Sequence, residues 1–149
     1  MGGKDHLYIL WTNGDPITAE KMVFMYGVNS LRRGWWNKVT LIIWGMPAKL
    51  SAENSEIQGK IKEALEAGVH ITACKACSDQ LGVTETLEKM NVEVKYWGEP
   101  LTKILKSGDT PTAMMAIGMA ASKTLPAPGA RRRPRRSGRI AATPRAMRR

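Results

Sequence analysis

Hydrophobic residues gather in four short segments within the first 109 residues, and turn-forming residues follow each segment. The segments are Leu7–Trp11, Val39–Trp44, Val69–Ala73 and Val92–Trp97. Short apolar runs bounded by turns are typical of strands buried in a parallel sheet. Helix-forming stretches separate the segments, so the pattern predicts βαβ units. The sequence therefore predicts a three-layer α/β fold, with a mostly parallel sheet of four to five strands and helices on both faces.

Capping residues predict where the first helix begins and ends. Asp15 is an expected N-cap, and Pro16 follows at the first helical position, where a missing N–H costs nothing. Met22 and Met25 lie near helical spacing inside this stretch. Gly34 then supplies the residue that ends the helix.

The later helices are marked by similar signals. We expect Ser51 to cap a helix over residues 52–67 and Thr84 to cap another over residues 84–90. A short last helix is expected over residues 101–106, because Ser107 and Gly108 stop it.

The chain changes character after residue 109. Residues 1–109 carry 13 basic and 13 acidic side chains, whereas residues 110–149 carry ten basic side chains and no acid, so the net charge of +10 belongs to the second part. We therefore divide the chain into an α/β domain of residues 1–109 and an Arg/Ala/Pro-rich tail of residues 110–149. Within the tail, the segment 113–117 either pairs at a sheet edge or extends as a helix, and disorder is expected from Leu125 onward.

Two cysteines lie at the end of the third predicted strand, and their number limits what they can do. Cys74 and Cys77 are too few for a secreted disulfide framework or for a structural zinc site. His70 cannot complete such a site, since four strand residues place it ~13 Å from Cys74. Phosphate-binding glycine motifs are also absent from the sequence. We expect no metal, no cofactor, no membrane span and a cytoplasmic location.

Cys74 stands where chemistry is expected in a parallel sheet. Ligands bind at the carboxyl ends of such strands, and a neighbouring Lys75 together with helix amides would favour the thiolate. We therefore expect Cys74 to be exposed and ionised at the mouth of the sheet. The other strand ends should supply an apolar rim of three tryptophans and a methionine with a few polar groups: Trp11, Trp44, Trp97, Met46, Thr12, Asn13 and Glu99.

A structural interpretation competes with this one for each residue. Cysteine often behaves as a small buried hydrophobe, and tryptophans are more often core or subunit contacts than ligand platforms. His6 and His70 are most simply satisfied or solvated histidines. A thioredoxin-like dithiol also places two cysteines at this spacing, but helix-bearing connections continue after it here, so that scaffold fits poorly.

Several segments together resemble the DsrE/DsrF-like family of small sulfur-relay proteins over about residues 4–109. The matching pattern is Val69-x-Ile71-x-Ala73-Cys74-x-x-Cys77-Ser78-Asp79-x-Leu81-Gly82-Val83, then Val92-Glu93-Val94-x-Tyr96-x-Gly98-x-Pro100-Leu101-Thr102 and Leu105-Lys106-x-Gly108. The resemblance implies a cytoplasmic α/β domain that assembles as a dimer, trimer or hexamer. It also implies that Cys74 accepts sulfur as a persulfide and passes it between donor and acceptor proteins.

Two departures from the family pattern change what we expect. Cys77 follows the relay position by one helical turn, so it is a candidate resolving thiol. Family members end with one last apolar strand soon after the Leu105-Lys106-x-Gly108 segment, which this chain lacks in recognisable form. We interpret residues 110–149 as a frameshifted or fused extension, and expect the sheet to lack its proper edge strand.

The favoured function is sulfur transfer through Cys74 and Cys77, with Thr12, Asn13, Trp44, Met46, Lys75, Trp97 and Glu99 around them. A second hypothesis is a non-catalytic oligomeric scaffold or regulatory protein, in which tryptophans such as Trp35 and Trp36 form interfaces. A third is nonspecific nucleic-acid binding through the arginine-rich tail, since phosphate neutralisation alone gives sequence-independent affinity.

Overall fold

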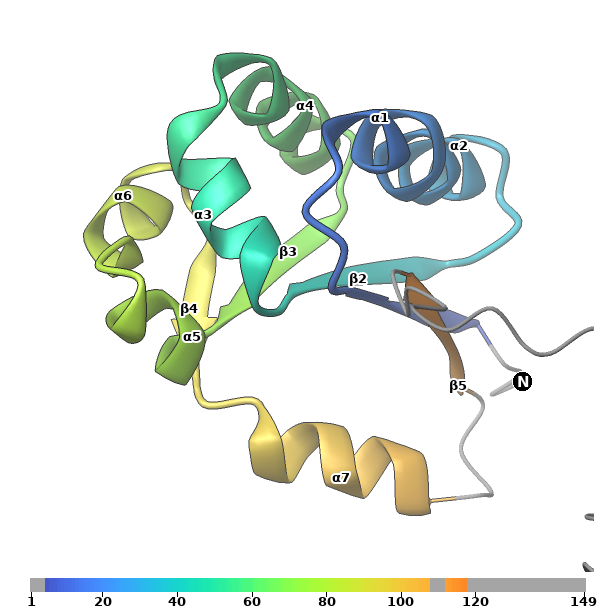
Figure 1. Ribbon diagram of the computed structural model, residues 1–149. Coiled ribbons are helices and arrows are strands. Elements are labelled where there is room, and N and C mark those ends of the chain that lie inside the picture. Colours follow the sequence, from blue (N-terminus) through green and yellow to red (C-terminus); the bar gives the residue numbers. More distant parts are fainter. Residues whose placement is uncertain (1–4, 108–111, 118–149) are drawn as a thin grey trace, which may run out of the picture.

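The computed structural model describes residues 5–107 and 112–117, and within these ranges the chain forms one parallel sheet (Figure 1). The sheet order is β4-β3-β2-β1-β5, and every neighbouring pair is parallel. The strands are β1 His6–Trp11, β2 Lys38–Ile43, β3 His70–Cys74, β4 Glu93–Lys95 and β5 Thr112–Ile117. The predicted α/β class and parallel sheet are therefore confirmed.

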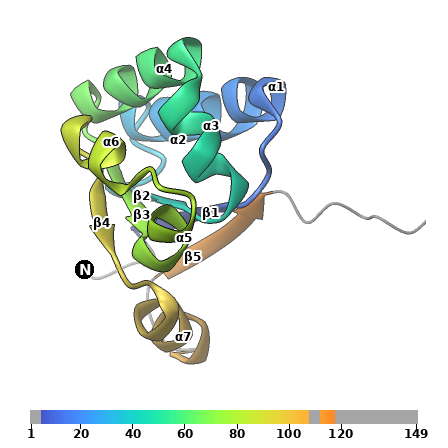
Figure 2. The same cartoon turned by 60° about the vertical axis from the view of Figure 1, so that its left-hand side comes forward.

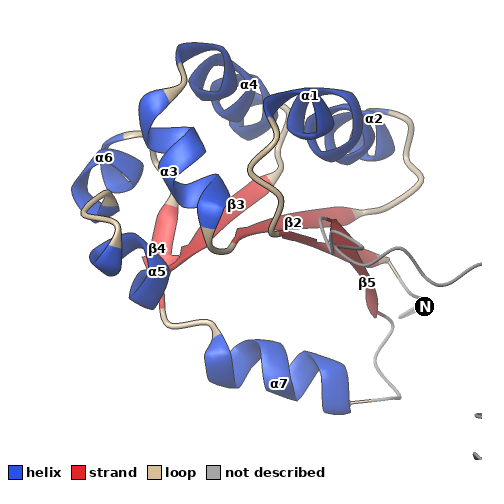
Figure 3. Cartoon of the chain, in the orientation of Figure 1, coloured by secondary structure: helices blue, strands red, loops and turns tan. Residues whose placement is uncertain are grey.

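Helices lie on both faces of the sheet, although unevenly. They are α1 Pro16–Thr18, η1 Ala19–Phe24, α2 Met25–Arg32, α3 Met46–Glu53, α4 Ser55–Glu66, α5 Lys75–Gln80, α6 Thr84–Lys89 and α7 Gly98–Lys106. The helices from α1 to α4 cover one face, and α7 lies on the opposite side of the sheet in both views (Figures 1 and 2). Colouring by secondary structure shows the same three layers (Figure 3).

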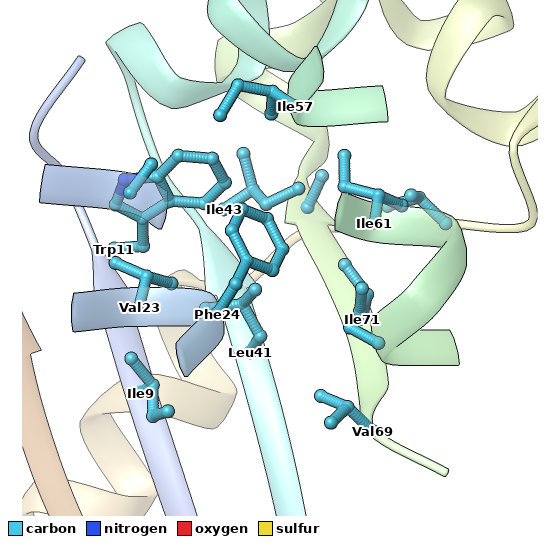
Figure 4. Close-up of a cluster of buried hydrophobic side chains, with 14 of the residues drawn as sticks. Ile9, Trp11, Val23, Phe24, Leu41, Ile43, Ile57, Ile61, Val69 and Ile71 are labelled. Atoms are coloured by element: carbon cyan, nitrogen blue, oxygen red, sulfur yellow. The ribbon is translucent and has the colours of Figure 1, made fainter. Parts of the chain in front are cut away.

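The main core fills the space between the sheet and the helices from α1 to α4. Alternate strand residues point into it, so β1 contributes Leu7, Ile9 and Trp11, all at most 3% exposed. Figure 4 shows Ile9 and Trp11 in one cluster with Phe24 and with Ile57 and Ile61 of α4. Gly27 lets α2 approach β1 closely, because a Cβ there would lie 3.3 Å from the Cδ1 atom of Ile9.

The first helical stretch contains a π-helical segment that the sequence did not reveal. Asp15 caps the start of the whole helical stretch, and Gly34, with φ +67°, follows its end, as predicted. Met22 and Met25, which lie near helical spacing, are exposed, whereas Val23 and Phe24 are buried and face the core.

Two predicted helix caps were also wrong. Ser51 lies inside α3, and Asn54 caps α4 by accepting hydrogen bonds from the amides of Glu56 and Ile57. The cause is Pro47, which opens a helix directly after Gly45. Thr84 is the first residue of α6, and its hydroxyl donates to Asp79 instead of capping the helix.

The sheet has an edge strand, β5: of the two alternatives for residues 113–117, pairing at a sheet edge is confirmed, whereas the expectation that the sheet lacks its edge strand was wrong. β5 pairs with β1 in parallel over its whole length, from His6 with Thr112 to Trp11 with Ile117. Pro111 precedes the strand, so its missing N–H removes no ladder bond from residues 112–117. The sheet thus continues past the predicted boundary at residue 109. The interpretation of residues 110–149 as a frameshifted or fused tail stays a prediction, and apart from residues 112–117 that tail lies outside the described residues.

Candidate functional site

Cys74 ends β3 and begins α5, but its side chain is buried. It is 3% exposed and belongs to a small apolar cluster with Ile42 and Trp97. We expected the Cys74 side chain to be exposed at the mouth of the sheet, and this expectation of exposure was wrong. The physical reason is Trp97, which follows β4 and packs on the face of the sheet to which Cys74 points. The residue does stand at a helix start, as the N-cap of α5.

Cys77 lies one helical turn later and reaches the surface in part. It packs against the cluster of Ile42, Cys74 and Trp97, and the groups that act on the pKa of its thiol include the Cys74 side chain and the backbone N–H of Gly45. Burial raises the pKa of the Cys77 thiol, the Gly45 amide acts in the opposite direction, and the bond with Cys74 raises the pKa further. Both cysteines are free, so the site is a reduced thiol pair.

Gly45 holds a backbone conformation that strongly favours glycine. Its φ is +78° and its ψ is −131°, at the junction between β2 and α3. A Cβ on Gly45 would meet nothing within 4 Å, so the requirement is conformational and not steric. Gly45 is also the residue whose backbone N–H acts on the Cys77 thiol. The sequence Gly-Met-Pro indicated a turn at this position but not its relation to Cys77.

Lys75 does not point its charge at the thiols. Its ammonium nitrogen lies 3.0 Å from a carboxylate oxygen of Asp79, one turn along α5. The hydrogen bond to Asp79 raises the pKa of Lys75. Asp79 also accepts a 2.6 Å hydrogen bond from the Thr84 hydroxyl. The bond from Thr84 is the main cause that lowers the pKa of Asp79, and the bond from Lys75 lowers it further. The Lys75 ammonium thus pairs with Asp79 within α5, and its role as a thiolate partner stays a prediction.

The three tryptophans of the expected rim have three different environments. Trp11 is fully buried in the main core, with its ring edge-on to Phe24 at 5.4 Å between centroids. Trp97 is buried over Cys74, and its indole N–H donates to the Thr72 hydroxyl at 2.8 Å. Trp44 is half-buried at the border of the same cluster. The structure therefore brings Trp44 and Trp97 to the thiol pair and removes Trp11 from it.

The remaining predicted binding residues are only loosely connected to the thiols. Met46, beside Gly45, is 56% exposed. Thr12 and Asn13 follow β1, where the Asn13 side chain accepts from the amide of Asp15. Glu99 is exposed and pairs with Lys103 at 2.6 Å. No hydrogen bond described here joins Asn13, Met46 or Glu99 to either cysteine.

A polar network on the same sheet face escaped sequence analysis. The Thr40 hydroxyl, 1% exposed, lies 2.8 Å from Nε2 of His6 and 3.4 Å from Nδ1 of His70. Nε2 of His70 lies 2.6 Å from a carboxylate oxygen of Glu93. The four side chains thus link β1 to β4, and the two histidines are satisfied as expected. Strand alternation places them on this face, but only the register brings them together.

The grooves described on the surface lie away from the thiol pair. Grooves of about 380 and 410 Å³ lie beside α4, one against α1 and one against the end of α6, and neither cysteine lines them. Among the described residues no cluster of His, Cys, Asp or Glu could hold a metal ion. In the same part of the chain, no helix is long and apolar enough to cross a membrane.

Comparisons with known proteins identify similar structures. No family model and no curated protein matches the chain. BT1422 from Bacteroides thetaiotaomicron, described as a conserved protein of unknown function, is 38% identical with a TM-score of 0.74, over 78% of this chain and 98% of that chain. The ychN protein from E. coli, whose fold is DsrE-like, is 16% identical with a TM-score of 0.51, over 74% of this chain and 98% of that chain.

Proposed function

The chain belongs to the same family as BT1422, and from the geometry of its two thiols we propose that it carries sulfur as a persulfide on Cys74. The likeness to ychN supports the DsrE-like fold alone. The observation that carries the proposal is the packing of the half-buried Cys77 against the apolar cluster that buries Cys74, at the end of β3.

Burial suits a residue that stores sulfur. A persulfide on an exposed cysteine is open to attack by any solvent thiol, whereas access limits that reaction at a buried sulfur. Ile42 and Trp97 pack with the Cys74 side chain and keep bulk solvent away from it. The neighbouring Cys77 supplies a hydrogen-bonding group in a site that is otherwise apolar.

The chemistry needs no cofactor. A thiolate attacks the outer sulfur of a donor persulfide, a new S–S bond forms to that sulfur, and the old S–S bond breaks to release the donor thiolate. The sulfane sulfur moves without net oxidation or reduction. We propose a sulfur-donor protein and a sulfur-acceptor protein as partners, in the reducing cytoplasm where both thiols stay free.

The test is intact-mass analysis after incubation with a small persulfide such as cysteine persulfide, followed by a brief challenge with a small thiol. The wild-type protein should gain one sulfur atom and keep it through the challenge. Cys74→Ser should lose any sulfur that it gained, because Cys77 is accessible to the challenging thiol. A wild-type protein without an adduct, or an equal adduct on the Cys74→Ser/Cys77→Ser double variant, would refute the proposal.

A homo-oligomeric scaffold is the second candidate, favoured by large apolar side chains on the surface. Trp35, Tyr96 and Leu105 are 57%, 65% and 64% exposed. Covering side chains of this size with a second copy of the chain removes apolar area from water and so favours association. We propose that the chain forms a dimer, trimer or hexamer. Sedimentation of the wild type and of Tyr96→Ser and Leu105→Ser tests this, and a monomeric wild type would contradict it.

A further inference from the structure

The accessibility of the two sulfurs suggests an order of events, and the inference rests on the sulfur-carrier function proposed above. We propose that sulfur enters at Cys77 and is then passed inward to Cys74, with the backbone N–H of Gly45 holding the Cys77 sulfur in place. Gly45 is a positioning residue here. The assignment reverses the roles that the sequence suggested, in which Cys74 met the donor first.

Burial decides which sulfur a donor can meet. Cys74 is 3% exposed and packed against Ile42 and Trp97, so a donor persulfide cannot approach it in line without displacing one of them. Cys77 is half-buried in the first turn of α5 and packs against the cluster that contains Cys74. A donor therefore reaches Cys77 first, and Cys77 in turn reaches Cys74.

The transfer proceeds in two balanced steps. The Cys77 thiolate attacks the outer sulfur of the donor persulfide, and the donor leaves as a thiolate. The Cys74 thiolate then attacks the outer sulfur of the Cys77 persulfide, so that a new S–S bond forms on Cys74 and the Cys77 thiolate is released and takes up a proton. Each step forms one S–S bond and breaks one, and no oxidant or reductant is consumed. Attack on the inner sulfur instead would give a Cys74–Cys77 disulfide and release hydrogen sulfide.

Gly45 has a conformation and a hydrogen bond that serve this arrangement. Its amide bonds to the Cys77 sulfur, and its φ of +78° is a backbone angle that other residues rarely adopt. An alanine at position 45 would disfavour this backbone angle and so change the direction of the amide. It would cause no clash, because a Cβ there would meet open space. Gly34 gives a matched control, because its φ is +67°, its Cβ would also meet open space, and it ends α2 far along the chain from either cysteine.

The first experiment measures the rate of loading with cysteine persulfide by quenched intact-mass analysis. Cys77→Ser should load about tenfold more slowly or worse than the wild type, because the donor must reach a buried sulfur. Cys74→Ser should load at a rate close to that of the wild type and then lose its sulfur to a thiol challenge. Loading of Cys77→Ser at the wild-type rate would refute entry at Cys77 while leaving the sulfur-carrier function intact. Absence of loading in the wild type would instead refute the carrier function.

The second experiment tests Gly45 through the pH profile of Cys77 alkylation by iodoacetamide. Gly45→Ala should move the midpoint of the profile to higher pH, because the thiolate loses an amide donor. Gly34→Ala should leave the midpoint where the wild type has it, with circular dichroism verifying that both variants are folded. An unchanged midpoint in folded Gly45→Ala would refute the positioning role, and the loading comparison of the cysteine variants stands even if Gly45→Ala does not fold.

Discussion

The two faces of the sheet differ in how closely their side chains are packed and in how many of them are polar. One face packs Leu7, Ile9 and Trp11 of β1 into a continuous apolar core under the helices from α1 to α4. The other face carries His6 and Tyr8 at one end and the cysteine cluster at the other, with α7 as its described helix. The described part of α7 contains no fully buried residue. The comparison indicates that the first face holds the fold together, while the second is available for chemistry and contacts.

Adjacent residues of β1 give the sharpest and largest test of this difference. Ile9 is fully buried on the core face, whereas Leu10 is only partly buried on the other. Ile9→Ala should lower the free energy of unfolding by about 2–5 kcal/mol, because it leaves a cavity in a packed core. Leu10→Ala should cost about 1 kcal/mol, since it removes less buried area. Urea unfolding of both variants measures the difference, and equal losses would show that the two faces are equally packed.

Thr72 tests whether the second face has a specific structure of its own. Its hydroxyl accepts from the indole N–H of Trp97 and donates to the carbonyl of Glu93, both at 2.8 Å. Thr72→Val keeps the shape of the side chain but leaves the buried indole N–H without a partner. The free energy of unfolding should fall by about 1–3 kcal/mol.

The matched control is Thr102→Val, at an exposed position of α7. Its hydroxyl donates to a solvent-accessible carbonyl, so the change should be smaller than at Thr72. If both variants unfold at the same urea concentration, Trp97 is not held by the Thr72 bond.

His6 gives the smallest effect, as a pH dependence. Burial, then Lys38 and His70, lower its pKa from the ordinary 6.5. Below pH 6.5 the unfolded chain therefore binds a proton at His6, while the folded chain does so only at lower pH. The free energy of unfolding falls as the pH decreases from 6.5 toward the lowered pKa of His6 in the folded chain. The groups facing it are Tyr8, Lys38, Thr40 and His70, with Glu93 beyond His70.

His6→Gln should flatten this dependence. Unfolding is measured at about pH 7.5 and about pH 5.5, on either side of the ordinary histidine pKa. The wild type should lose more stability between the two than the variant does. A variant that loses as much as the wild type would assign the acid sensitivity to another group.

The sequence was informative wherever a pattern is local. Apolar runs predicted the strands, and the Asp15-Pro16 pair and Gly34 predicted the ends of the first helical stretch, because caps and left-handed angles depend on neighbouring residues. It was misleading where tertiary packing decides. Met22 and Met25 of the first helical stretch are exposed while Val23 and Phe24 face the core, and α3 begins at Met46, six residues before the start of the expected helix.

The candidate site was located from sequence but its environment was not. The spacing of Cys74 and Cys77 predicted two thiols at a strand-to-helix junction, which the structure has. The burial of Cys74 depends on Trp97, which lies 23 positions later and arrives there through β4. The contact between Gly45 and Cys77 likewise joins separate βα connections, so local pattern alone could not reveal it.

The most direct test of the sulfur-carrier account is to locate the sulfur atom at equilibrium. The wild-type protein is loaded with cysteine persulfide, persulfides are trapped with an alkylating reagent under denaturing conditions, and tandem mass spectrometry of the peptide that spans both cysteines identifies the modified residue. The account predicts the extra sulfur on Cys74. Sulfur resting on Cys77 alone, or a peptide without any, would contradict it.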